Sequence, residues 1–132
     1  MSAIRVILVE DDEDDKNLFD TFFSSRTDIE LLPTAGNGLE LIAYLEAVGV
    51  DEDLPQLIIL DQNMPKMNGK KTLEFLKASG RYARIPVVVY STFADTSLII
   101  ECRKLGAKMV AVKPIDNEGY QRMMDDFLSA SR

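Results

Sequence analysis

The sequence predicts an α/β domain with a doubly wound five-stranded parallel sheet, covered by helices on both faces. Short apolar runs alternate five times with amphipathic stretches along the 132 residues, an order typical of α/β folds. Three of the runs, at 6–9, 57–60 and 87–89, are apolar without interruption. Such runs are expected of parallel strands that are buried on both faces. The chain length suits one domain.

Five strands are expected, one for each apolar run, at residues 4–9, 29–33, 57–60, 87–90 and 109–112. The stretches between and after them carry apolar residues at the three- and four-residue spacing of an amphipathic helix. These stripes are Leu18, Phe19, Phe22 and Phe23; Leu41, Leu45 and Val48; Leu73 and Leu76; Leu98, Cys102 and Leu105; and Tyr120, Met124 and Phe127. We therefore expect a (βα)₅ arrangement.

Helix boundary signals agree with this alternation. Gly49 and Gly80 follow the second and third stripes, and glycine commonly stands just past a helix end. Asp95 and Asn117 precede the fourth and fifth stripes, and both residue types are favourable N-caps. The connections are short, and residues 1–132 are expected to form one domain without a second one.

The charge and the residue types exclude several classes of function. The net charge is −7 and the chain has no histidine. An acidic chain is poorly suited to nucleic acid, whose phosphates need clustered Lys and Arg. Without histidine there is no Ser-His-Asp triad, no histidine-ligated zinc and no phosphohistidine formed on this chain. A histidine that takes part in phosphoryl transfer must belong to a partner.

The sequence also limits where the protein is located and what its single cysteine can do. No apolar run reaches the 18 residues of a membrane-spanning helix, so we expect no membrane insertion. The first residues lead directly into a strand pattern and lack the features of a signal peptide, which favours the cytoplasm. Cys102, the single cysteine, cannot form an internal disulfide, and its place in a helical stripe indicates a core residue.

Chemically active side chains stand where four of the predicted strands end. In doubly wound folds, ligands bind beyond the carboxyl ends of the strands. Acids follow the first and third strands, a hydroxyl ends the fourth and a lysine follows the fifth, namely Glu10, Asp11 and Asp12; Asp61; Ser91; and Lys113. These side chains are therefore expected to converge at one edge of the sheet.

The acids at this edge predict a metal site. Two carboxylates about 4 Å apart repel by about 4 kcal/mol at an effective dielectric of about 20, and a cation between them removes that cost. Mg²⁺ prefers oxygen ligands and binds through a few carboxylates. Acids also favour helix N-termini, and this accounts for Glu13, Asp14 and Asp15. Glu10 and Asp11 directly follow the strand and are better explained as metal ligands.

Ser91 and Lys113 extend this site toward phosphoryl chemistry. A metal-bound phosphoryl group carries excess negative charge, which an ammonium and a hydroxyl on neighbouring strands would stabilise. Each residue alone means little, since serine often caps and lysine is common in loops. Together with the carboxylates they predict a phosphoryl-transfer site in which a carboxylate is the nucleophile.

Four segments resemble the receiver domain of response regulators, in order and at the spacing of that family. They are IRVILVEDD at 4–12, LIILDQNMPKMNG at 57–69, IPVVVYST at 85–92, and the segment 106–114 that begins Gly-Ala and ends Val-Lys-Pro. The resemblance implies a flavodoxin-like fold with strand order 2-1-3-4-5. It also implies a stand-alone receiver domain over 1–132, with no output domain, that acts in two-component signalling and is not a classical enzyme.

The same resemblance assigns roles to individual residues. Asp61 matches the aspartate that becomes phosphorylated. Ser91 matches the switch hydroxyl that turns toward the phosphoryl group, and Lys113 matches the lysine that pairs with that group. In this family the bond from this lysine to the following proline, here Pro114, is typically cis.

The implied Mg²⁺ ligands are Glu10, Asp11, Asp61 and the backbone carbonyl of Asn63. Asp11 and Asp12 could instead be taken as the family's acidic pair. We prefer Glu10 and Asp11, because the first acid of the family directly follows the last apolar strand residue, here Val9.

The implied partners are a histidine kinase or histidine phosphotransfer protein and an unidentified downstream protein. Homodimerisation would use the face formed by the fourth helix, fifth strand and fifth helix. Two alternatives stay open, a phosphate sink and a docking module that is never phosphorylated. An aspartyl phosphatase is disfavoured, because it needs a second acid two residues after the nucleophile, where this chain has Asn63.

One departure from the family affects signal output. The family usually has an aromatic switch residue three positions before the lysine, and this chain has Val110 there. After the switch hydroxyl, where small residues are common, it has Thr92 and Phe93. We therefore expect output to depend on the segment 91–95 and the helix that follows it.

Overall fold

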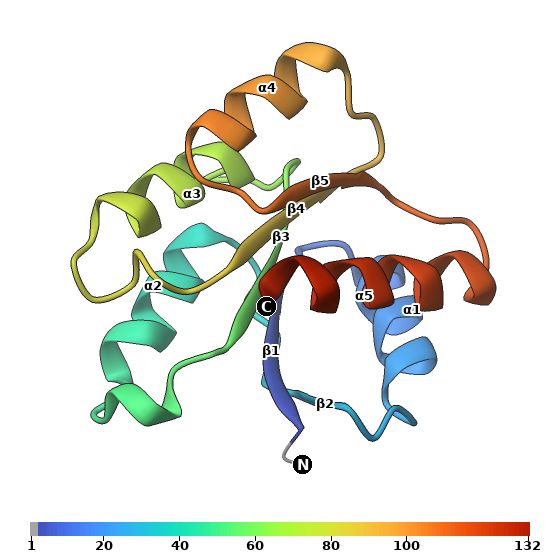
Figure 1. Cartoon of the computed structure of the whole chain (residues 1–132), viewed down its shortest axis with the longest axis horizontal. Helices are drawn as coiled ribbons and strands as arrows, with labels where there is room; N and C mark the ends of the chain where they lie inside the picture. The colour runs from blue at the N-terminus through green and yellow to red at the C-terminus, as the bar shows by residue number, and fades with distance from the viewer. Residues whose placement is uncertain (1–2) are drawn as a thin grey trace.

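One parallel sheet of five strands, in the order β2-β1-β3-β4-β5, forms the centre of the computed structural model, which describes residues 3–132 (Figure 1). The strands are β1 (Ile4–Val9), β2 (Ile29–Leu31), β3 (Leu57–Asp61), β4 (Val87–Ser91) and β5 (Met109–Val112). The helices are α1 (Glu13–Phe23), α2 (Gly38–Ala47), α3 (Gly69–Ala78), α4 (Thr96–Lys104) and α5 (Asn117–Ser131), with a short 3₁₀ helix η1 (Asp51–Asp53) before β3. The predicted fold class and strand order are confirmed.

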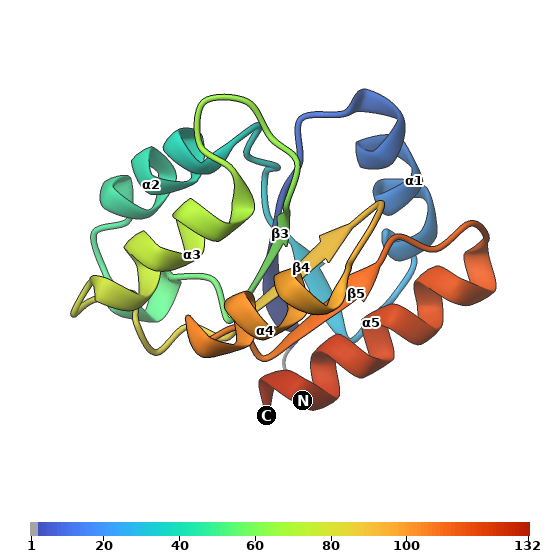
Figure 2. The same ribbon diagram turned by 90° about the horizontal axis from the view of Figure 1, so that it is seen from above.

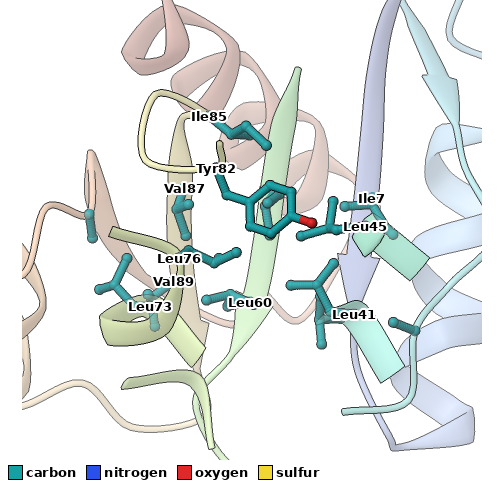
Figure 3. Close-up of a cluster of buried hydrophobic side chains, with 14 of the residues drawn as sticks. Ile7, Leu41, Leu45, Leu60, Leu73, Leu76, Tyr82, Ile85, Val87 and Val89 are labelled. Carbon is teal, nitrogen blue, oxygen red and sulfur yellow. The ribbon is translucent and has the colours of Figure 1, made fainter. Parts of the chain in front are cut away.

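The helices divide between the two faces of the sheet, as Figures 1 and 2 show. On one face, α2 and α3 pack against the sheet through residues such as Leu41 and Leu73 (Figure 3). Cys102 of α4 belongs to the same cluster. On the other face, α1 and α5 cover the sheet through Phe19 and Phe127. Because both faces are covered, β3 and β4 are buried at every position, which explains their continuous apolar sequences.

The strand predictions hold closely, with one informative error. β1 and β5 have the predicted bounds, while β3 and β4 each extend one residue further, to Asp61 and Ser91. The second strand ends at Leu31, two residues earlier than predicted. Leu32 still donates its N–H to the Val6 carbonyl, but Pro33 has no N–H and cannot continue the pairing.

The helix signals were right in four respects and wrong in two. Asp95 caps α4 by accepting the N–H of Leu98 at 2.9 Å, Gly49 and Gly80 stand two residues past the ends of α2 and α3, and Cys102 is fully buried. The N-cap of α5, however, is Asp116, which accepts the N–H of Gly119, and the predicted cap, Asn117, is the first helical residue. Leu18 is 41% exposed, so the core stripe of α1 is narrower than predicted.

Within the described part of the chain, no helix combines the length and the apolar character that a bilayer crossing requires.

Candidate functional site

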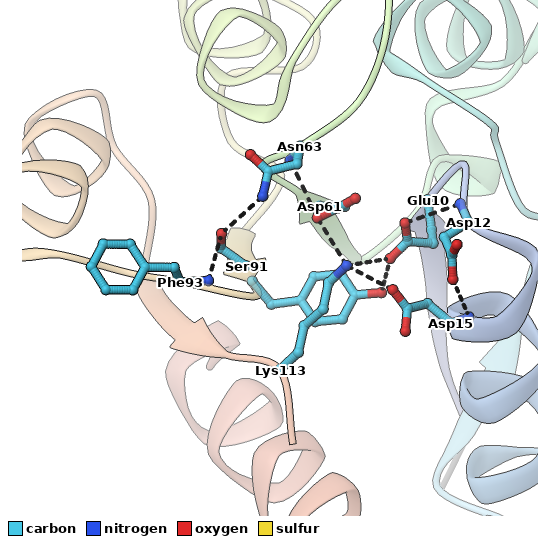
Figure 4. A network of polar contacts seen from close by, with 9 residues as sticks. Glu10, Asp12, Asp15, Asp61, Asn63, Ser91, Phe93 and Lys113 are labelled. Carbon is cyan, nitrogen blue, oxygen red and sulfur yellow. Dashed lines mark hydrogen bonds and ion pairs between the residues drawn. The ribbon is translucent and has the colours of Figure 1, made fainter. Parts of the chain in front are cut away.

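The carboxyl ends of β1, β3, β4 and β5 meet at one edge of the sheet and carry the candidate site (Figure 4). Val9 pairs with Leu60 in the register of β1 and β3, so the residues after them, Glu10 and Asp61, become neighbours. Ser91 pairs with Val112 in β4 and β5, which places Lys113 one residue beyond Ser91. Strand register alone thus brings the predicted residues together.

Three carboxylates form the acidic part of the site. Glu10, Asp11 and Asp61 each offer a ligand oxygen, and these atoms all lie within 4.8 Å of one another. Glu10 and Asp61 are buried, at 0% and 1% exposure, while Asp11 is exposed. This set fits Mg²⁺, which takes oxygen ligands from a few carboxylates and keeps several waters on its open side.

Asp12 has a different role from the other acids that follow β1. Its carboxylate accepts the N–H of Asp15 at 2.9 Å and caps α1. Its own N–H donates to Oε2 of Glu10 at 3.2 Å. The cluster of three carboxylates therefore contains Glu10 and Asp11, the preferred acidic pair, and Asp12 is the N-cap of α1.

The surroundings of Asp61 disfavour the ionised form of its carboxyl group. Burial, followed by the neighbouring Glu10, raises the pKa of Asp61 from 3.8 to about 7, although the charge of Lys113 acts in the opposite direction. A carboxyl group with such a pKa is only partly ionised near neutral pH. A divalent cation beside it would favour the ionised form, which is the form that can act as a nucleophile.

Lys113 is the cationic centre of the site, and its ammonium contacts three carboxylates. The distances from Nζ are 3.1 Å to Glu10 Oε1, 2.8 Å to Asp15 Oδ2 and 3.2 Å to Asp61 Oδ1. Burial disfavours its charge, but the hydrogen bond to Asp15 and the nearby carboxylates outweigh this and raise the pKa of Lys113 above its usual value. These contacts therefore favour the charged form of the Lys113 side chain.

Ser91 is almost fully buried, and its hydroxyl is held by the chain itself. Its Oγ accepts the N–H of Phe93 at 3.3 Å and the side-chain amide of Asn63 at 3.4 Å. Asn63 also donates its backbone N–H to Oδ1 of Asp61, at 3.3 Å. The hydroxyl, the phosphoacceptor candidate and the loop after β3 are thus linked by direct hydrogen bonds.

A close approach of α3 completes the site. A Cβ atom at Gly69 would lie 2.7 Å from the carbonyl oxygen of Asp61, a distance that side chains do not tolerate. Glycine at this position lets the start of α3 pack directly against the end of β3. The N–H of Gly69 donates to the carbonyl of Gln62 at 3.2 Å, which closes the loop that contains Asn63.

Two residues of the site were missed by the sequence reasoning. Asp15 was explained as an acid at a helix start, yet it forms the shortest of the three contacts of Lys113. The sequence pattern predicts Tyr90 only as a strand residue, yet its hydroxyl donates to Oε1 of Glu10 at 2.6 Å. An aromatic hydroxyl directly before the strand-end serine was a signal, but strand periodicity cannot show which face it occupies.

One implied feature is absent. The bond between Lys113 and Pro114 is trans, as is every peptide bond in the described residues, so the implied cis bond is wrong for this structure. Trans is the ordinary state of a bond to proline, favoured by about 0.5–1 kcal/mol.

Residues 6–125 match the family model of the response regulator receiver domain. The chain belongs to this family. It is a receiver domain of two-component signalling, and the resemblance of its sequence motifs is confirmed over most of its length.

Curated relatives include two proteins named protein-glutamate methylesterase/protein-glutamine glutaminase. The one from Bacillus licheniformis is 36% identical over 113 residues, which cover 84% of this chain and 29% of the relative. The one from Clostridium acetobutylicum is 32% identical over 134 residues, which cover 100% of this chain and 37% of the relative. The receiver domain therefore spans about a third of the length of these relatives.

Solved structures of similar size resemble the receiver domain more completely. The Mn²⁺-bound form of response regulator Rcp1 is 30% identical with a TM-score of 0.79, over 96% of this chain and 92% of that one. The phosphorylated cyanobacterial phytochrome response regulator RcpA is 30% identical with a TM-score of 0.80, over 96% and 95%. CheY in a CheX–CheY–BeF₃–Mg complex from Borrelia burgdorferi is 26% identical with a TM-score of 0.77, over 94% and 89%.

Proposed function

We propose that this receiver domain accepts a phosphoryl group on Asp61 from a phosphohistidine of a partner protein, in a Mg²⁺-dependent reaction. The observation that carries this proposal is the position of the Asp61 carboxylate, which lies 3.2 Å from the Lys113 ammonium and beside the carboxylates of Glu10 and Asp11. A nucleophile, a fixed cation and a set of metal ligands thus share one sheet edge. The solved structures of Mn²⁺-bound Rcp1 and phosphorylated RcpA, both 30% identical to this chain, support the same chemistry.

The residues divide the reaction among them. An oxygen of the Asp61 carboxylate attacks the phosphorus, the bond between phosphorus and the imidazole nitrogen of the donor breaks, and the electron pair returns to that nitrogen. Glu10, Asp11 and Asp61 would hold Mg²⁺, which supplies positive charge to the phosphoryl oxygens. Lys113 neutralises a further part of the charge in the transition state. The donor supplies the histidine, because this chain has none.

The product is expected to change the position of Ser91. In the structure its hydroxyl accepts a hydrogen bond from the N–H of Phe93. A phosphoryl group on Asp61 offers strong acceptor oxygens, and the hydroxyl would turn to donate to one of them. Phe93 would then lose the acceptor for its N–H, and the loop before α4 would rearrange.

We infer that the signal is read as a change in protein contacts on the face made by α4, β5 and α5. This face exposes apolar side chains, with Ile100 48% and Val112 55% exposed, and it adjoins the loop that contains Phe93. A downstream protein or a second copy of this chain would bind there. The domain acts as a phosphoacceptor that assists its own phosphorylation, not as a classical enzyme. A phosphate sink would undergo the same phosphorylation on Asp61 but would have no downstream protein to bind.

The test is intact-mass spectrometry after incubation with a small phosphodonor and Mg²⁺. We expect a gain of one phosphoryl group, and its loss in Asp61→Asn or when EDTA replaces Mg²⁺. Asp14→Asn, which removes an exposed acid of the same type nearby, is the matched control and should react normally. Hydroxylamine cleaves an acyl phosphate but not a serine phosphate, which identifies the modified group. An unchanged mass with small donors and with phosphohistidine proteins would contradict the proposal.

A further inference from the structure

Tyr90 contacts the phosphorylation site with both parts of its side chain. It lies on β4 directly before Ser91 and is fully buried. Its hydroxyl donates to Oε1 of Glu10 at 2.6 Å, and the Nζ atom of Lys113 lies 4.9 Å from the centroid of its ring. The ring of Phe19 packs against it edge-on at 6.5 Å, which fixes its position from α1.

The hydrogen bonds of Glu10 show what the tyrosine hydroxyl contributes. Oε1 of Glu10 receives the hydroxyl of Tyr90 and the ammonium of Lys113, while Oε2 receives the N–H of Asp12. An ionised carboxylate has about four acceptor positions, so at least one remains for a cation or its bound water. A fully buried carboxylate without such donors would be costly. The tyrosine is therefore one of three groups that fix the orientation of Glu10.

The hydroxyl also affects how Lys113 is shared. Lys113 is the only other side chain among the described residues with a hydrogen bond or ion pair to Oε1 of Glu10, and it is shared with Asp15 and Asp61. If Tyr90 did not donate, Glu10 would attract the ammonium more strongly and draw it from Asp61. The aromatic face below Nζ adds a favourable cation–π contact and restricts where the ammonium can lie.

A simpler explanation is that Tyr90 only fills space in the core and that its hydroxyl donates to Glu10 because this carboxylate is the nearest acceptor. The neighbouring core positions of β4 are Val87, Val88 and Val89, which fill space without a polar atom. A tyrosine hydroxyl buried in an apolar cluster needs a partner, and an aliphatic residue would avoid that need. Its acceptor here is Glu10, a carboxylate of the acidic cluster, so the hydroxyl affects the candidate site as well as the core.

We propose that Tyr90 is a positioning residue of the phosphorylation site, whose hydroxyl orients Glu10 toward the bound cation and whose ring supports Lys113 beside Asp61. The inference rests on the proposed function, because it presumes that the acidic cluster binds Mg²⁺. It assigns to Tyr90 no contact with the phosphoryl group itself.

The first test compares Tyr90→Phe with the wild type, since phenylalanine retains the ring and removes only the hydroxyl. We expect the dissociation constant for Mg²⁺, measured by titration calorimetry, to rise about tenfold, as for the loss of one hydrogen bond to a charged group. The rate of phosphorylation at saturating Mg²⁺ should change much less, because the ring still supports Lys113. A purely structural role would lower the melting temperature and leave the Mg²⁺ constant unchanged.

The matched control is Tyr82→Phe, which removes the hydroxyl of a tyrosine that is buried in the core cluster on the other face of the sheet. Its Mg²⁺ constant should equal that of the wild type. Tyr90→Leu removes the ring as well, and we expect it to lower the saturated rate in addition to the affinity. An unchanged saturated rate in Tyr90→Leu would overturn the role of the ring.

A double-mutant cycle locates the effect. If the hydroxyl acts through the Glu10 carboxylate, adding Tyr90→Phe to Glu10→Gln should change the Mg²⁺ constant less than about twofold, because coupled residues are not additive. A further tenfold loss in that background would overturn the proposal. So would an unchanged Mg²⁺ constant in Tyr90→Phe alone. If the wild type itself neither binds Mg²⁺ nor gains a phosphoryl group, it is the proposed function that fails.

Discussion

The ammonium of Lys113 lies 2.8 Å from Oδ2 of Asp15, a residue 98 positions away in the sequence. This pair joins the end of β5 to the first turn of α1 across the candidate site. Both side chains are largely buried, at 12% and 24% exposure. The acidic partner of Lys113 on α1 thus competes with Asp61 for the same charge.

Removing the charge of Asp15 is therefore expected to favour phosphorylation. In Asp15→Asn the ammonium of Lys113 is left to Glu10 and Asp61, and the site becomes less repulsive to an anionic donor. We expect the initial rate with a small phosphodonor to rise by up to about fivefold, which corresponds to about 1 kcal/mol, a typical upper value for one ion pair. Asp14→Asn makes the same charge change one residue away, on an exposed side chain, and should raise the rate much less. A slower reaction in Asp15→Asn would instead show that Asp15 holds Lys113 in its working position.

The raised pKa of Asp61 predicts how the free energy of unfolding depends on pH in the absence of metal. Its pKa rises from 3.8 to about 7 because of burial and the neighbouring Glu10. Ionisation is thus more costly in the folded than in the unfolded state, so this group lowers stability as the pH rises from about 4 to about 7. The cost is complete above pH 7 and absent below about pH 4.

Asp61→Asn should remove this cost, because the amide resembles the neutral carboxyl and cannot ionise. The shift in pKa gives an upper limit of about 4 kcal/mol. Relaxation and water should screen part of it, so we expect the variant to be about 2 kcal/mol more stable at pH 8 in EDTA. The advantage should shrink steadily as the pH falls toward 4. Urea denaturation across this pH range measures it, with the exposed Asp53→Asn as the control that should show no such trend.

The convergence of the site was predictable because it depends only on topology. Glu10, Asp61, Ser91 and Lys113 stand within one residue of the ends of parallel strands, and these ends meet at one edge whatever the details of packing. Continuous apolar runs located the strands, since a sheet covered on both faces needs them. Register then followed from the fold.

The remaining features depend on side-chain direction, which periodicity does not encode. Both faces of β4 are buried, so no polar alternation shows that Tyr90 points toward Glu10. Leu18 and Phe19 both suit the stripe of α1, and only the packing of α1 in the folded domain, where Phe19 meets Tyr90 of β4, decides that Phe19 is buried and Leu18 exposed. Asp15 reaches Lys113 only because α1 begins at Glu13.

The choice between the two possible acidic pairs is open to a direct test. Asp11 belongs to the carboxylate cluster, whereas Asp12 caps α1. Asp11→Asn should weaken Mg²⁺ binding at least about tenfold, as expected when a metal site loses a charged ligand. Asp12→Asn should leave it nearly unchanged and also preserve the helix, because asparagine is as good an N-cap as aspartate. Calorimetric titration with Mg²⁺ measures both, and a loss of affinity in Asp12→Asn as large as that in Asp11→Asn would assign the metal to Asp11 and Asp12.

The last prediction concerns how a change at Asp61 and Ser91 moves the loop before α4, given that position 110 is not aromatic. The chain has no tryptophan, so Phe93→Trp places a single fluorescent reporter in the loop, at a side chain that is 72% exposed. With Mg²⁺ and beryllofluoride, a mimic of the phosphoryl group, we expect its emission to change, because the Ser91 hydroxyl ceases to accept the N–H of residue 93. Ser91→Ala should abolish most of this change.

Two further variants distinguish the loop from residue 110. Phe75→Trp places the reporter on α3, where a phenylalanine is also partly exposed, and should respond little to beryllofluoride. Val110→Tyr, which restores the usual aromatic, should leave the response of the Phe93→Trp reporter unchanged if the loop moves on its own. Val110 is only partly buried and packs against the core cluster beneath α2, α3 and α4. It has no aromatic ring or hydroxyl that could change position when Ser91 moves. A much larger response in Val110→Tyr would show that the loop of this receiver domain moves fully only with an aromatic partner.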